Sequence, residues 1–134
     1  MLTERAVDWW RLHGGEFKSF EHLQPFSMLL KWPTGDQDTP VPMLIGAETL
    51  HASNLGDLSP FSYRDRLAGP WREYGLTAMQ KHRRVASTGE PEFGLSQFPG
   101  GLWGEPFHYE WITLPCRLKG ASLIVNLSRR VTIN

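Results

Sequence analysis

The sequence predicts an α+β domain, in which an antiparallel sheet has helices gathered on one face and a further helix precedes the first strand. Strand-like apolar runs occupy residues 26–32 and 43–50, and three more fill 92–98, 107–118 and 121–129. A long helical pattern separates the two groups of strands. Strands and helices that are segregated along the chain, instead of alternating one by one, are typical of α+β domains.

Composition indicates a globular protein and excludes several function classes. The 134 residues, 40% hydrophobic and 21% charged, suffice for one domain with a single core. The 14 basic and 14 acidic side chains balance, so no bulk charge attracts nucleic acid or an anionic membrane. One cysteine cannot form an internal disulfide, and no signal peptide or membrane-spanning run is visible. We expect a cytoplasmic protein.

Residues 1–20 are predicted to form an N-terminal helix or extension, and residues 21–134 the main domain. Thr3 is a suitable N-cap, and Gly14-Gly15 supplies residues that tolerate the positive φ angles at a helix end. Trp9 and Trp10 point about 100° apart on such a helix, so one can pack on the sheet while the other faces outward. We expect this helix either to cap its own sheet or to form a homodimer contact.

The first half of the main domain contains two strands and an irregular region. Strand 26–32 ends at a Pro-Thr-Gly-Asp turn signal, and the chain passes Pro40 and Pro42 as a loop before strand 43–50. In residues 52–67 the apolar positions are interrupted by glycine, proline, aspartate and asparagine. This pattern indicates short helical turns instead of one regular element.

The second half contains the long helix and a three-stranded meander. One helix face carries Trp71, Tyr74, Ala78, His82 and Val85, and the segment Thr88–Pro91 ends the helix. Strands 107–118 and 121–129 are predicted to form a hairpin with a turn at Lys119-Gly120. Pro115 lies inside the first of these strands without a donor for the ladder, so we expect a bend there.

This order of elements resembles that of a PAS domain, with two strands, short helices, a connecting helix and three more strands. Segments similar to PAS motifs cover nearly the whole chain: Trp10–Gly15, Leu23–Phe26, Ile45-Gly46, Leu55–Leu58, Val85–Pro91, Glu110–Pro115 and Gly120–Leu127. The first two are similar to a subgroup of bacterial PAS proteins, in which a helix with a tryptophan and a Gly-rich end precedes strand one.

The resemblance implies a five-stranded antiparallel sheet with the order 2-1-5-4-3. It also implies a stand-alone, non-catalytic sensory or signalling module that binds a small molecule or a protein partner. Such a module acts on a separate signalling protein through dimerisation. The asparagine-cysteine motif of flavin-binding photosensory PAS domains is absent, because Cys116 lies late in the chain, and we expect Cys116 to be a small buried residue. The cofactor is unknown from the sequence.

A ligand pocket is expected beneath the helices, because concave apolar sites with a few polar groups are typical of small-molecule binding. The candidate ligand-binding residues are Leu55, Leu58, Phe61, Trp71, Tyr74, His82, Trp111 and Asn126. His82 also matches the position at which haem-binding PAS sensors carry an axial histidine, so it is either a hydrogen-bonded core residue or a haem ligand. The alternative for the aromatic residues is that they only fill the core.

Catalytic and metal-binding motifs do not stand out. The sequence has no nucleophile elbow, no phosphate-binding loop and no pair of histidines at metal-binding spacing. His108 and Glu110 share one face of a strand, and we expect them to be a solvent-facing polar pair instead of metal ligands.

The alternative function is a small α+β cavity enzyme of the cone-shaped isomerase or hydratase type. Enzymes of this class place a carboxylate beside a histidine or tyrosine deep in the cavity. The candidates are Tyr74 or His82 with Asp57 or Asp65.

Overall fold

The computed structural model describes residues 2–18, 23–32, 41–45, 72–98 and 106–132. Its elements in chain order are α1 (Leu2–Leu12), the 3-10 turn η1 (Gln24–Phe26), β1 (Ser27–Lys31), β2 (Val41–Ile45), α3 (Arg72–Thr88), β3 (Glu92–Phe98), β4 (Phe107–Leu118) and β5 (Ala121–Val131). Residues 52–67, where short helical turns are predicted, lie outside the described residues. Within the described ranges, neither helix combines the length and the apolar character needed to cross a membrane.

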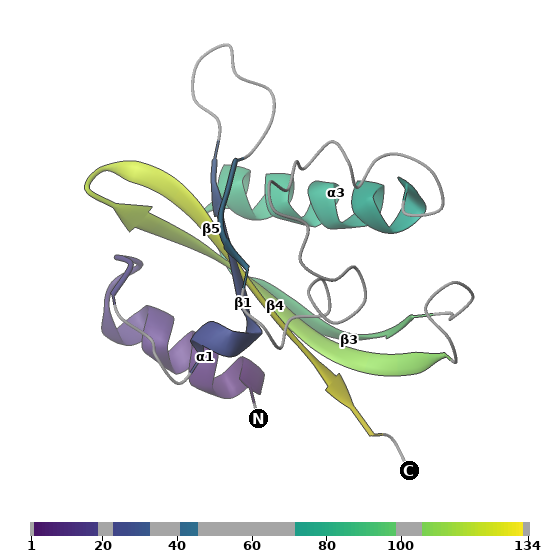
Figure 1. Ribbon diagram of the computed structural model, residues 1–134. Helices are drawn as coiled ribbons and strands as arrows, with labels where there is room; N and C mark the ends of the chain where they lie inside the picture. Colours follow the sequence, from purple (N-terminus) through teal and green to yellow (C-terminus); the bar gives the residue numbers. More distant parts are fainter. Residues whose placement is uncertain (1, 19–22, 33–40, 46–71, 99–105, 133–134) are drawn as a thin grey trace.

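The strands form an antiparallel sheet in the order β2-β1-β5-β4-β3 (Figure 1). β1, β5, β4 and β3 make its continuous body, and the five-residue β2 pairs with the outer edge of β1. β5 pairs with β1 on one side and with β4 on the other, so the apolar run Leu123–Leu127 lies centrally. The prediction of an α+β domain with an antiparallel sheet, an N-terminal helix and a further helix is confirmed.

Different helices cover the two faces of this sheet. Side chains alternate between the faces along β5, so Leu123, Val125 and Leu127 pack on the α1 side. Ile124 points the other way and packs with Val85 of α3. Figure 1 shows the sheet running between α1 and α3. α1 therefore caps its own sheet, which is one of the two expectations for the N-terminal helix, because a strand that is apolar on both sides needs a cover on each.

A buried carboxylate attaches α1 to the sheet. Glu110 is 3% exposed, accepts a hydrogen bond from the Leu2 backbone N–H at 3.3 Å, and pairs with the Arg129 guanidinium at 2.7 Å. A carboxylate at the first turn satisfies a free backbone donor and complements the helix dipole. Thr3 is not the predicted N-cap, since it lies within α1 and its hydroxyl donates to Glu110 at 3.5 Å. The sequence predicted that Glu110 faces solvent together with His108. This prediction is wrong for Glu110, which is buried and pairs with Arg129 on the neighbouring strand β5.

Pro115 lies where β4 extends beyond its neighbour β3. β3 pairs with β4 only as far as Thr113 and does not reach Pro115. The proline therefore costs the sheet no hydrogen bond to β3, although it has no N–H to donate. The segment after α1 covers this edge: the Arg117 N–H donates to the Gly15 carbonyl at 2.9 Å, and the Trp10 indole N–H donates to the Pro115 carbonyl at 2.6 Å. Pro115 therefore marks the point where the N-terminal segment takes the place of β3 beside β4.

The second strand begins earlier than predicted and contains a proline. The prediction placed Pro42 in a loop and the strand at 43–50, whereas β2 covers Val41–Ile45, and residues 46–50 lie outside the described residues. Pro42 stands opposite Leu30 at an irregularity in the register. The proline is tolerated because β2 is the edge strand, where one side of the backbone needs no ladder donor.

Other boundaries follow the predicted turn chemistry. Gly14 and Gly15 follow α1 with φ angles of 60° and 81°, and Gly89 follows α3 with a φ of 70°. The hairpin between β4 and β5 turns at Lys119 and Gly120, whose φ angles of 50° and 81° are both positive, as in a two-residue type I′ turn. The glycines therefore stand where the backbone requires them.

Replacement of Glu110 by glutamine should lower the free energy of unfolding by about 2 kcal/mol, because Arg129 loses its buried countercharge and the first turn of α1 loses a charged acceptor. Urea denaturation measures the change. The matched control is Glu16→Gln, which removes an ion pair with Arg117 of similar geometry, 3.0 Å, but between half-exposed side chains. The control should cost less than about 1 kcal/mol. Equal losses in both variants would contradict the anchoring role of Glu110.

Candidate functional site

A small cavity lies between α3 and the face of the sheet that α3 covers. We call it the α3 cavity; its volume is about 40 Å³. His82 of α3, Trp111 of β4 and Asn126 of β5 all line it, so the structure brings together three residues predicted as ligand contacts from distant parts of the sequence. Lys81 and Thr113, which were not predicted, line it as well.

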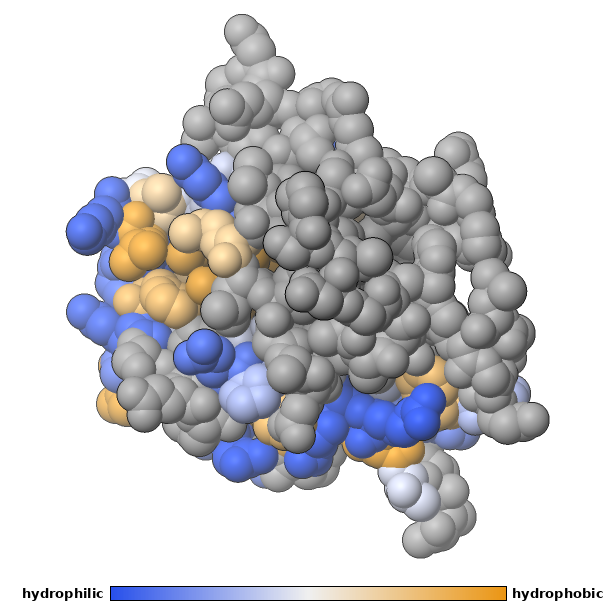
Figure 2. Space-filling model, in the orientation of Figure 1, coloured by the Kyte–Doolittle hydropathy of each residue, from blue (hydrophilic) through white to orange (hydrophobic). Residues whose placement is uncertain are grey.

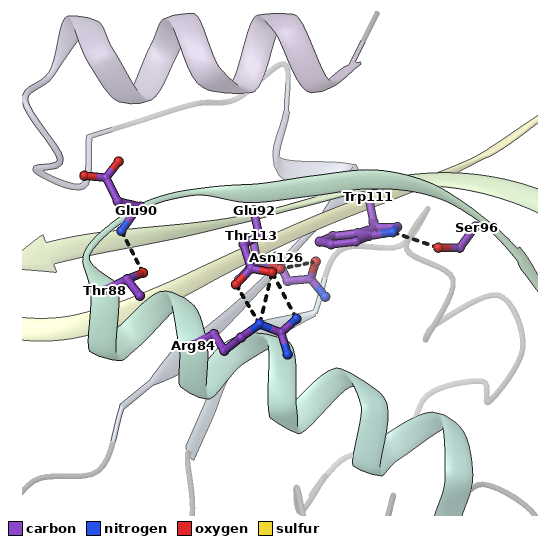
Figure 3. Close-up of polar contacts among 8 residues, drawn as sticks. All are labelled: Arg84, Thr88, Glu90, Glu92, Ser96, Trp111, Thr113 and Asn126. Atoms are coloured by element: carbon purple, nitrogen blue, oxygen red, sulfur yellow. Dashed lines mark hydrogen bonds and ion pairs between the residues drawn. The ribbon is translucent and has the colours of Figure 1, made fainter.

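Strand register explains why these residues meet. Thr113 pairs with Asn126 and Trp111 pairs with Ser128 across β4 and β5, so all four side chains project toward α3. The Thr113 hydroxyl and the Asn126 Oδ1 atom lie 3.4 Å apart and share a hydrogen bond (Figure 3). Thr113 is 1% exposed. The sheet therefore presents a paired hydroxyl and amide to the cavity.

Trp111 is fixed in place by contacts from two elements. A Cβ atom at Gly94 of β3 would lie 3.1 Å from the Trp111 ring, so the ring rests directly on the glycine backbone. The Trp111 indole N–H donates to the Ser96 hydroxyl at 3.0 Å (Figure 3), and the Lys81 ammonium lies 3.9 Å from the ring centroid. The ring therefore forms a rigid wall, because both its rotation and its tilt would break a contact.

Lys81 supplies the positive charge at this cavity. Burial lowers the pKa of Lys81, the neighbouring Arg84 lowers it further, and Glu92 opposes both effects. Glu92 is engaged elsewhere, since both of its carboxylate oxygens accept hydrogen bonds from the Arg84 guanidinium at 3.0 to 3.2 Å (Figure 3). Two cations thus share one carboxylate, and the local charge is positive.

His82 is buried in the core at the edge of the α3 cavity, with 1% of its surface exposed. The space enclosed there by the described residues has room for about three water molecules, which is far less than a haem requires. His82 is therefore a core residue in this structure, and a haem would require α3 to move away from the sheet.

Several predicted site residues cannot be compared with the structure. Leu55, Leu58, Phe61 and Trp71 lie outside the described residues, as do Asp57 and Asp65 of the alternative enzyme site. Tyr74 belongs to α3, but its side chain is outside the described set.

The sequence contained signals for two of the residues that were missed. Gly94 is an isolated glycine inside a strand, a pattern that indicates a close approach of another group to the backbone. Lys81 precedes His82, and its long stem allows the ammonium to reach over an aromatic ring on a neighbouring strand. Thr113 carries no such signal, because its partner Asn126 is only identified once the register of the hairpin is known.

A larger hollow of about 570 Å³ lies at the far end of α3, beside the end of α1 and the β4–β5 hairpin. Trp10 and Trp32 line it together with Arg11 and Arg117, and Figure 2 shows apolar surface next to charged side chains at this end of the molecule. Its Arg117 guanidinium is already paired with Glu16. None of the predicted ligand contacts that the structure describes lies in this hollow.

Nucleophilic and metal chemistry find no support among the described residues. Cys116 is 3% exposed, and burial raises the pKa of its thiol to about 12, although Arg117 acts in the opposite direction. The prediction of a small buried cysteine is confirmed. Among the side chains that the structure describes, no three histidine, cysteine or acidic groups gather in a way that could hold a metal ion.

Comparison with known proteins yields no relative. No protein-family model matches the chain, and no curated protein matches it. The fold and the chemistry of the α3 cavity are therefore the basis for a functional proposal.

Proposed function

We propose that the chain is a PAS-like sensory module that binds a small molecule in the α3 cavity and catalyses no reaction. The convergence of His82, Trp111 and Asn126 on this cavity carries the proposal, because these side chains come from three elements and the sequence pattern predicts each of them as a ligand contact. Concave sites that combine apolar walls with polar groups are typical of small-molecule binding, and Trp111 and Ala78 supply the apolar wall here.

The fold offers a route by which occupancy of the cavity can be transmitted. Along β4, Trp111 and Thr113 face the α3 cavity, whereas Ile112 and Leu114 pack on the α1 side. A ligand that displaces β4 therefore acts on both helices at once, because the packed core deforms little without a response on the opposite face. We propose that a separate signalling protein in the cytoplasm receives this change.

The alternative of a cavity enzyme gains no observation in its favour. It requires a carboxylate next to a histidine or tyrosine in the cavity. Among the described lining residues, His82 and Tyr109 are present but no carboxylate is. The candidate acids Asp57 and Asp65 lie outside the described residues.

Native mass spectrometry of the protein purified from its own source should show a retained small molecule. Asn126→Leu removes the polar anchor at nearly constant volume, so the retained mass should be lost while the protein stays folded. Ser122→Leu, an exposed position on the same strand, is the control and should keep the ligand. Protein that is empty under gentle conditions, together with a turnover activity that depends on His82, would contradict the proposal and favour the enzyme.

We also propose that the protein forms a homodimer through α1. The two tryptophans of α1 both make contacts within the same chain, so the dimer contact has to use other residues of the helix. Trp9 is 7% exposed in the core that α1 shares with the sheet, and Trp10 is tied to Pro115 by its indole N–H. The apolar surface that α1 leaves uncovered includes Leu12, which is 79% exposed. A second copy is the occupant we propose for that surface, since symmetric contacts bring like patches together.

Light scattering at micromolar concentration should give about twice the 15.3 kDa mass of one chain. Leu12→Glu should yield monomers without loss of folding, because the charge is placed on an exposed position of α1. Ser87→Glu on the exposed surface of α3 is the control and should leave the dimer intact. A monomeric wild type would end this part of the proposal.

A further inference from the structure

Two donors in the α3 cavity have no acceptor among the residues that the structure describes. Among the described residues, no carboxylate or carbonyl accepts a hydrogen bond from the Lys81 ammonium, which lies 3.9 Å from the centroid of the Trp111 ring. The Asn126 side chain uses its Oδ1 atom to accept from Thr113, and within the same described part of the chain its amide nitrogen has no acceptor. Both residues line the same cavity.

The electrostatic balance favours a negative charge in that position. Lys81 and Arg84 together carry two positive charges, and Glu92 compensates only one of them, through hydrogen bonds to Arg84. Within the described lining of the cavity there is no acidic side chain. Half-burial of Lys81, which lowers its pKa, shows that water solvates the ammonium only in part. An anion bound next to it would regain the lost solvation as a charge-assisted hydrogen bond.

The walls of the cavity indicate which kind of anion fits. The enclosed volume of about 40 Å³ corresponds to about three water-sized groups. Trp111 and Ala78 supply apolar contact, and the Lys81 ammonium, 3.9 Å from the Trp111 ring centroid, and the Asn126 amide supply donors. A short-chain carboxylate has this distribution, with two adjacent acceptor oxygens and a small apolar end.

We propose that the ligand of the α3 cavity is a small carboxylate, held by the Lys81 ammonium and the Asn126 amide nitrogen, with its apolar end against Trp111. This inference rests on the proposed sensory function and adds the chemical class of its ligand. Lys81 contributes the charge, Asn126 fixes the orientation of the carboxylate, and the Thr113 hydroxyl holds the Asn126 amide in position. Gly94 is required indirectly, because any side chain there displaces the Trp111 wall.

Thermal melting in the presence of formate and acetate tests the inference, at an ionic strength kept constant with sodium chloride. We expect a saturable rise in melting temperature of roughly 5 °C at ten times the dissociation constant. Acetamide, which has nearly the shape of acetate but no charge, should cause no saturable rise. Inorganic phosphate and additional chloride should cause none either.

Variants identify the groups involved. Lys81→Met keeps most of the stem and should weaken acetate binding at least about tenfold, because the charge-assisted bond is lost. Arg83→Met removes the same charge from an exposed position two residues along α3 and should leave the affinity unchanged. Asn126→Leu should also weaken binding. Melting of each variant without ligand shows whether it is folded.

Several results would overturn the inference. These are an equal rise with acetamide, an equal rise with chloride or phosphate, unchanged acetate binding by Lys81→Met, or no rise with any carboxylate. The sensory proposal is judged separately by the mass retained in native mass spectrometry. A retained uncharged molecule, combined with no response to carboxylates, would refute the ligand class and leave the sensory function standing.

Discussion

The central strand of the sheet is buried on both faces, and the rest of the fold depends on this constraint. Leu123, Ile124 and Val125 are each at most 2% exposed, although successive side chains point to opposite sides. Each such side chain contributes about 2 kcal/mol by leaving water. Exposing the whole α1 side would cost on the order of 10 kcal/mol, which is comparable to the net stability of a domain. α1 is therefore a structural half of the core, and Glu110 strengthens its attachment to the sheet.

The two faces of the sheet have different chemistry. On the α1 side, apolar side chains fill the interface and Glu110 satisfies the helix end. On the α3 side, Thr113, Asn126 and His82 place polar groups beneath a helix, which costs free energy unless each finds a partner. Thr113 and Asn126 find a partner in each other. The cavity thus lies on the face where the core is not optimised for packing alone.

The sequence predicted the strands and helix ends that local rules determine, such as β3, the hairpin turn at Lys119-Gly120 and the end of α3 at Gly89. It placed His82, Trp111 and Asn126 in one site, because helix and strand periodicity assigns them to inward faces. It failed where the partner is distant along the chain. Glu110 acts through Leu2, 108 residues away, and no local pattern announces that contact. The same limit hid the use of Lys81, whose role follows only from the position of the Trp111 ring.

Native-state amide hydrogen exchange tests most directly whether α1 is an integral half of the core. The slowest amides of α1, around Ala6 and Trp9, should exchange through the same opening as those of Leu123–Leu127 in β5. Their free energies of opening should agree within about 1 kcal/mol and fall in parallel as urea is added, because neither element is stable without the other. The opposite result is α1 amides that open several kcal/mol more easily than β5, with no dependence on urea. That result would show α1 to be a detachable appendage and would contradict a core that needs a cover on both faces.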